Sequence, residues 1–131
     1  MNLSYRIGNT LCSWMTSAEA PLARLPVLRR IAAVAESKGY CLTEASFEDN
    51  FYANYPDLDT MEQRLPNDFQ RAEDALDGHW IKYNYDTVLL QVRLNDDPEK
   101  EMNIVYYRGM LKIIGCDEAD EKAFEQAVRG E

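Results

Sequence analysis

The sequence contains few of the residues on which catalytic and metal sites are usually built. It has a single histidine, His79, and three cysteines, Cys12, Cys41 and Cys116, which are far apart in the chain. A histidine-based zinc site needs several ligands at close spacing, so this inventory does not predict one. The odd cysteine number does not suit a disulfide framework. Because Cys41 and Cys116 stand beside apolar residues, both are expected to be small buried hydrophobic side chains.

Sequence motifs for phosphate binding and for hydrolysis are also missing. The six glycines are scattered, and the chain has no Walker loop and no G-x-G-x-x-G, G-x-S-x-G or H-E-x-x-H motif. Asp57, Asp59 and Asp68 match three positions of a calcium loop. However, Met61 and Glu62 stand where an oxygen ligand and a glycine are required. We therefore expect no cofactor and no metal.

Long apolar runs are absent as well. Apolar runs such as Val88–Leu90 fall far short of the roughly 18 to 20 residues of a membrane span. The first residues lack a basic region followed by an apolar stretch, so no signal peptide is expected and a cytoplasmic location is predicted. With 131 residues, 46% of them hydrophobic, the chain is expected to form a single domain, 1–131, with one core.

Helical periodicity is clearest in the first third of the chain. Val27, Leu28 and Ile31 belong to an apolar stripe that predicts a helix from about Pro26 to Lys38, ended by Gly39. The basic residues of this region are expected to form a solvated face; they are Arg24, Arg29, Arg30 and Lys38. The preceding segment, Asn2 to Met15, is predicted to be a short helix or an edge element.

The central region shows weaker patterns. Tyr40 to Phe47 alternates weakly and predicts a strand. From Phe51 to Asp77 the pattern fits either two short helices or a loop followed by a helix that begins with Pro66 in its first turn. Trp80 to Tyr83 and Val88 to Leu94, with a turn between them, predict a hairpin.

The last third predicts more strand and a final helix. Met102 to Tyr107 and Met110 to Ile114 form either one strand with a glycine bulge or two strands joined by a tight turn. A helix capped by Asp117 and ended by Gly130 follows. The order of elements predicts an α+β fold: an antiparallel three- to four-stranded meander with helices packed on one face.

Negative charge is concentrated between residues 40 and 78, where ten acidic residues and two arginines give a net charge of −8 out of −9 for the whole chain. Such a region is either a solvated surface or a binding face for a basic protein partner. Direct binding to nucleic acid or to an anionic membrane is disfavoured. The candidate partner-binding residues combine aromatic anchors with acids; they are Phe51, Tyr52, Tyr55, Asp57, Asp59, Glu62, Asp68, Glu73, Asp74 and Asp77.

This profile resembles, in composition only, that of small inhibitor proteins, including toxin-immunity proteins and inhibitors of nucleic-acid-directed defence complexes, anti-CRISPR proteins among them. The resemblance implies a stoichiometric inhibitor whose carboxylates stand in for phosphates, as in DNA mimicry. One alternative is a small cytosolic enzyme with a pocket between sheet and helices that uses His79 or a thiol. Another is a subunit of a homo-oligomer that pairs through sheet-edge residues near Met102 to Tyr107.

Overall fold

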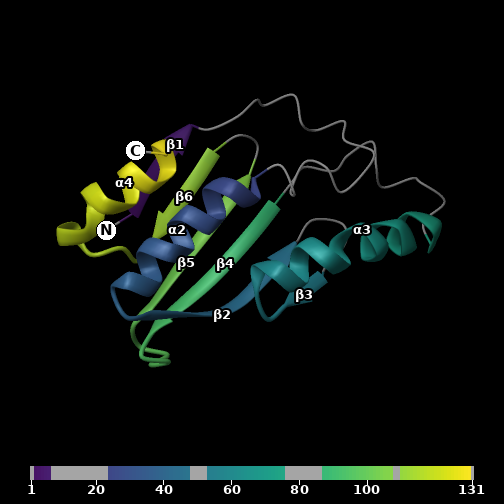
Figure 1. Ribbon diagram of the computed structural model, residues 1–131, viewed down its shortest axis with the longest axis horizontal. Coiled ribbons are helices and arrows are strands. Elements are labelled where there is room, and N and C mark those ends of the chain that lie inside the picture. The colour runs from purple at the N-terminus through teal and green to yellow at the C-terminus, as the bar shows by residue number, and fades with distance from the viewer. Residues whose placement is uncertain (1, 7–23, 48–52, 76–86, 108–109, 131) are drawn as a thin grey trace.

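A six-stranded antiparallel sheet forms the centre of the molecule (Figure 1). The computed structural model describes residues 2–6, 24–47, 53–75, 87–107 and 110–130. The strand order across the sheet is β1-β6-β5-β4-β2-β3. The strands are β1 (Asn2–Arg6), β2 (Tyr40–Phe47), β3 (Ala53–Tyr55), β4 (Thr87–Leu94), β5 (Glu101–Tyr107) and β6 (Met110–Ile114). The helices are α2 (Leu25–Ser37), α3 (Leu58–Ala75), the 3-10 helix η3 (Glu118–Asp120) and α4 (Glu121–Arg129).

The α+β class and the antiparallel sheet agree with the sequence, but the predicted number of strands is wrong. Two short strands complete the edges: β1 pairs with β6, which confirms an edge element near the N-terminus, and β3 pairs with β2. The predicted hairpin of Trp80 to Tyr83 with Val88 to Leu94 is described only in its second strand. β4 has β2 on one side and β5 on the other. Residues 80–83 themselves lie outside the described part of the chain.

Two other predictions concern the strands after β4 and the helix before it. β5 and β6 are two strands paired from Tyr107 and Met110 outward, so the two-strand alternative is confirmed, and residues 108–109 between them lie outside the described residues. Between β3 and Ala75 the structure describes one helix of 18 residues, α3, with Pro66 inside it rather than in its first turn. Pro66 is exposed. The missing N–H of a proline costs least on a solvated helix face, where water can bond the freed carbonyl.

Apolar side chains form continuous rows across the inner face of the sheet. One row takes a residue from each of the six strands in register; it consists of Leu3, Ile113, Ile104, Leu90, Ala45 and Tyr55. All six are buried. A parallel row runs through Leu111, Tyr106, Val88 and Phe47. Because opposite residues of an antiparallel pair stand about 5 Å apart, each row is a continuous line of contact.

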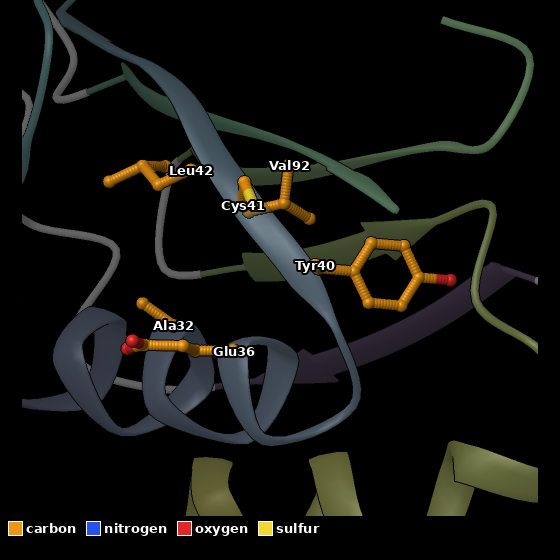
Figure 2. A pocket seen from close by; sticks show the side chains of 6 residues that line it. All are labelled: Ala32, Glu36, Tyr40, Cys41, Leu42 and Val92. Carbon is orange, nitrogen blue, oxygen red and sulfur yellow. The ribbon is translucent and has the colours of Figure 1, made fainter. Parts of the chain in front are cut away.

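A β-bulge at Thr43 keeps both halves of β2 on this inner face. Leu42 pairs with Val92 and Glu44 with Gln91, so Thr43 is the extra residue. The Thr43 hydroxyl donates a hydrogen bond of 3.0 Å to the Gln91 carbonyl. Without the extra residue, the strict alternation of a strand would place the first half of β2 on the opposite face from the second. Figure 2 shows this first half beside α2.

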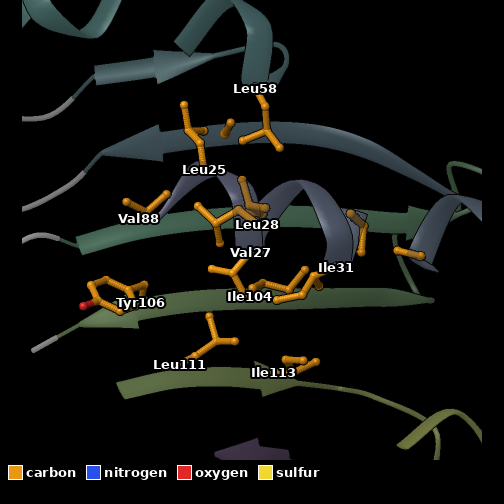
Figure 3. Close-up of a cluster of buried hydrophobic side chains, with 14 of the residues drawn as sticks. Leu25, Val27, Leu28, Ile31, Leu58, Val88, Ile104, Tyr106, Leu111 and Ile113 are labelled. Carbon is orange, nitrogen blue, oxygen red and sulfur yellow. The ribbon is translucent and has the colours of Figure 1, made fainter. Parts of the chain in front are cut away.

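The helices cover the inner face unevenly. α2 lies over the sheet, with Leu25, Leu28 and Ile31 packed toward the buried strand residues (Figure 3). α4 packs beside α2, and α3 packs against β3 and β2 and against the first part of α2. In Figure 1, α3 extends well past the β3 edge. The predicted packing of helices on one face is therefore correct only in part, because much of α3 lies beyond the sheet.

The basic residues of α2 connect it to the other helices, so the expected solvated basic face is wrong. Arg29 forms salt bridges of 2.7 Å with Asp59 and 2.6 Å with Glu62 of α3. Its guanidinium pKa is raised, chiefly by the hydrogen bond to Asp59. Lys38 forms a salt bridge of 2.9 Å with Asp120 of η3. Each pair joins two elements that are far apart in the sequence.

Arg30 supports the opposite flank of α2 by bonding the end of α4. Its Nε donates a hydrogen bond of 2.7 Å to the Ala127 carbonyl, and a terminal nitrogen donates one of 3.4 Å to the Val128 carbonyl. The Gly130 N–H bonds the Gln126 carbonyl. The last four carbonyls of an α-helix have no partner within it. Arg30 and the cap together therefore satisfy three of them.

We expect Arg30→Ala to lower the free energy of unfolding by about 1 to 2 kcal/mol, because two carbonyls lose a charged donor. Urea denaturation at pH 7 measures the change. Arg64→Ala is the matched control, because Arg64 is an exposed arginine of α3 with no salt bridge in the described residues. An equal loss in both variants would show that the Arg30 contacts contribute nothing specific.

Gly115 and Gly130 offer a second test, because both have a positive φ, of 89° and 79°. Gly130→Ala is expected to cost about 1 to 2 kcal/mol from the left-handed backbone alone. A Cβ at Gly115 would also lie 2.8 Å from the Glu101 carbonyl oxygen, whereas one at Gly130 meets only the Arg30 side chain at 3.6 Å. Gly115→Ala should therefore be clearly the more destabilising variant in the same urea experiment. Equal losses would contradict this close approach.

Candidate functional site

The structure describes only part of the predicted partner-binding set. Phe51, Tyr52 and Asp77 lie outside the described residues, and the side chain of Glu73 is not described. The remaining members belong to β3, to the turn after it and to α3. Tyr55, Asp57 and Asp68 contribute to the fold through hydrogen bonds or burial. Asp59 and Glu62 form salt bridges with Arg29.

Tyr55 is a core residue and not an exposed aromatic anchor. Its side chain is only 2% exposed and ends the row of apolar residues that crosses all six strands. Its hydroxyl donates a hydrogen bond of 2.8 Å to Asp68, which also forms a salt bridge with Arg71. Burial, and then the bond to Asp68, raise the pKa of the Tyr55 phenol. Asp68 is therefore used to satisfy a buried hydroxyl.

Asp57 begins α3 and forms its N-terminal cap. The Thr60 N–H donates a hydrogen bond of 2.6 Å to the Asp57 carboxylate. That bond is the main reason why the pKa of Asp57 is lowered. Asp59 and Glu62 on the next turn bind Arg29 but remain 77% and 57% exposed. Asp74 is exposed and accepts a hydrogen bond of 3.0 Å from Gln70.

A second group of carboxylates gathers at one end of the sheet, where three loops meet. The turn after α2 is joined to the β4–β5 loop by the hydrogen bond from the Asn95 N–H to the Gly39 carbonyl, 3.2 Å. The β6–η3 loop approaches through Gly115, which lies against the Glu101 backbone. We call this group the acidic end. Its members have exposed carboxylates without salt bridges in the described part of the chain; they are Glu36, Asp96, Asp97, Glu99, Asp117 and Glu118.

The acidic end is not apparent in the sequence, because it is assembled from three segments. Residues 79–114 have no net charge as a block, because basic residues inside and outside the β4–β5 loop offset its acids. The strand register shows which ends meet: Tyr40 pairs with Leu94, and Arg93 with Glu101. Only the run from Asp96 to Glu99 is visible in the sequence as a local signal.

An open pocket of about 330 Å³ lies between α2 and the first half of β2. Its lining comes from α2, β2 and β4; it consists of Ala32, Glu36, Tyr40, Cys41, Leu42 and Val92 (Figure 2). Val92 is 1% exposed and forms apolar floor, whereas Glu36 is exposed. The pKa of the Tyr40 phenol is raised by burial and then by Asp117 and Asp120.

The thiols show opposite environments. Cys41 is exposed, so its predicted burial is wrong: it stands on the outer face of β2, opposite Arg93. Cys116 is 1% exposed, and burial followed by Asp120 raises the pKa of its thiol. A raised pKa disfavours the thiolate that nucleophilic chemistry needs. His79 and Cys12 lie outside the described residues.

Neither a metal centre nor a membrane helix is found among the residues that the structure describes. No three histidine, cysteine or acidic side chains there are grouped so that they could hold a metal ion. Likewise, no helix in these ranges is long and apolar enough to cross a membrane. Comparison of the chain with protein-family models, with curated proteins and with solved structures found no match. The function must therefore be inferred from the chain's own geometry.

Tyr55→Ala should cost about 3 to 5 kcal/mol of unfolding free energy, because it empties a buried site in the core. Tyr55→Phe keeps the ring and should cost only about 1 kcal/mol, for the lost hydrogen bond.

A phenol with a raised folded-state pKa contributes stability that is present below about pH 10 and is lost as the pH rises further. Tyr55→Phe should therefore flatten the loss of stability above pH 10. Unfolding by urea between pH 7 and 11 tests both statements, and a mild effect of Tyr55→Ala would contradict the core role.

Proposed function

We propose that this protein is a stoichiometric binding protein that presents an acidic surface to a basic protein partner. A toxin held by its immunity protein and a nucleic-acid-binding defence complex held by an inhibitor are the kinds of partner that fit. The acidic end supports the proposal most strongly, because six exposed carboxylates from the end of α2, the β4–β5 loop and the start of η3 lie at one end of the sheet without salt bridges in the described residues. The acidic residues of α3 form a second, partly neutralised surface.

The positions of the cations strengthen the contrast between the acidic end and the partly neutralised surface of α3. In the described residues, Arg29, Lys38 and Arg93 each bind a carboxylate, and Arg30 binds carbonyls. These four cations are used within the fold. Lys100 of the β4–β5 loop is exposed and has no salt bridge in the described residues, but the carboxylates of the acidic end outnumber it. A surface of one sign raises the association rate with a partner of opposite sign and makes binding depend on salt. It repels the phosphates of nucleic acid, which favours a basic protein as the partner.

We expect a basic partner from the native host to be retained by the immobilised protein at low salt and released at high salt. Replacing the acids of two loops by their amides, as Asp96→Asn, Asp97→Asn, Glu99→Gln, Asp117→Asn and Glu118→Gln, should abolish this salt-sensitive retention. The amide variants keep side-chain size, and the amide oxygen introduced by Asp97→Asn can still accept the hydrogen bond that Asp97 accepts from the Glu99 N–H. Retention is measured by affinity capture and by the association rate of the captured protein.

The matched control neutralises α3 instead, as Asp59→Asn, Glu62→Gln and Asp74→Asn. If the control loses the partner and the sheet-end variant keeps it, the α3 surface is the binding face and the acidic end is only solvated. If both variants retain the partner equally at every salt concentration, the acidic surface has no part in binding and the proposal is wrong.

A further inference from the structure

Half of β2 has a free edge. β3 pairs only with Ala45, Ser46 and Phe47, so the stretch from Tyr40 to Thr43 has β4 on one side and no strand of the described residues on the other. The reason lies in the sequence after β3: Pro56 has no N–H for a further ladder bond, and Asp57 starts α3 by capping it. The chain therefore leaves the β2 edge after three paired residues.

The free edge borders the pocket between α2 and β2. Leu42 of β2 and Ala32 of α2 are both half-buried and both line it, above the buried Val92. Glu36 adds an exposed carboxylate without a salt bridge in the described part of the chain. At the other end of α2, the Arg29 salt bridges to Asp59 and Glu62 join α2 to α3 and so limit the length of the groove.

We propose that this groove binds an extended peptide segment of a partner protein, which adds as a strand to the free edge of β2. Unpaired backbone N–H and C=O groups of a sheet edge accept another strand, and a pocket beside them selects its side chains. The peptide would continue the line of β3 beyond Pro56 and run antiparallel to β2, as β3 does. The free stretch of four residues offers about 13 Å of edge, enough for a short motif.

The chemistry of the groove defines the motif. A volume of about 330 Å³ is at the lower end of the range for small-molecule sites, which suits one aliphatic or aromatic side chain over the apolar floor. Glu36 beside that pocket favours a lysine or arginine near the apolar residue. The expected ligand is therefore an extended segment with one large apolar side chain and a neighbouring cation. Glu36 is the one residue of the acidic end that this inference uses, because it lines the pocket; otherwise the inference stands on the strand edge and the pocket.

The probe is an oriented library of seven-residue synthetic peptides with leucine fixed at the centre and all other positions randomised. The full chain, immobilised at pH 7, should enrich peptides with lysine or arginine beside the leucine and without proline. A selected peptide should bind saturably, measured by fluorescence anisotropy. Failure to enrich any motif would overturn the proposal.

Backbone methylation of the selected peptide tests whether it pairs as a strand. In an antiparallel pair, alternate residues direct their N–H toward the neighbouring strand. N-methylation at one set of alternate positions should abolish binding, and methylation at the other set should be tolerated. A peptide that binds equally well with either set methylated would fill the pocket without extending the sheet, and this part of the proposal would be wrong.

Variants of the protein test the pocket. Ala32→Met should fill it and weaken the selected peptide about tenfold or more, whereas Ala33→Met, at an exposed position of the same helix, should have no effect. Glu36→Lys should weaken a lysine-containing peptide roughly fivefold or more and shift the library toward acidic residues. Unchanged affinity in both Ala32→Met and Glu36→Lys would contradict the site.

Two further outcomes distinguish peptide binding in this groove from binding at the acidic end and from dimerisation. The acidic-end variant, which retains Glu36, should bind the selected peptide as the parent does, so loss of the basic partner in that variant leaves this inference standing. If the free protein instead forms a dimer in sedimentation experiments and Ala32→Met makes it monomeric, the occupant is a second copy of the chain and the proposed peptide partner is wrong.

Discussion

Arg29 and Arg30 are neighbours on α2, and because successive residues of an α-helix point about 100° apart they reach different flanks of it. Arg29 binds the first turns of α3, and Arg30 binds the last carbonyls of α4. Apolar packing alone allows helices to slide, since it is not directional. The two guanidinium groups add directional bonds on both sides. They hold α3 and α4 in position relative to α2, and α2 itself is anchored by Leu28 and Ile31 over the sheet.

The same contacts determine which charges remain at the surface. A basic face on α2 would have offset the acids around it, but its cations point into contacts with α3, η3 and α4. Surface salt bridges contribute little stability individually, so their main effect here is on position and on charge. The acids of α3 are partly neutralised by Arg29 and Arg71. In the acidic end Lys100 of the β4–β5 loop is an exposed cation, but the carboxylates outnumber it, and this excess of negative charge is the physical basis of the proposed binding surface.

Local signals predicted α2 and the end of α4 well, but the predicted cap of the last helix is wrong: Asp117 precedes η3 and makes no side-chain cap hydrogen bond, and α4 begins at Glu121. Pro26 in the first turn, the apolar stripe and the stop at Gly39 mark α2, and Gly130 with a φ of 79° ends α4.

The sheet was harder to predict than the helices, because its strand order depends on contacts between distant segments. Tyr40 pairs with Leu94, and no local pattern encodes that pairing. It places β5 in the interior between β4 and β6, so Met102 to Tyr107 cannot be the predicted oligomerisation edge. Tyr55 was misjudged for a similar reason, since three residues are too few to show alternation.

The bulge in β2 makes this strand hard to recognise in the sequence. It also brings the first half of β2 to the inner face, beside the proposed groove. The weak alternation of β2 in the sequence is the result of the bulge at Thr43, which lets Tyr40, Leu42, Ala45 and Phe47 all face the helices. The second half of β2 is covered by α3, where Phe47 packs against Phe69 with ring centroids 6.3 Å apart.

The first half of β2 is not covered by α3 or β3, because Pro56 and Asp57 turn the chain away before β3 reaches it. A strand buried at one end and open at the other leaves Leu42 half-exposed beside backbone groups that no described strand pairs. Closing that edge with an added strand would satisfy the backbone and cover the apolar floor in one step, and this is the physical reason to expect a partner there.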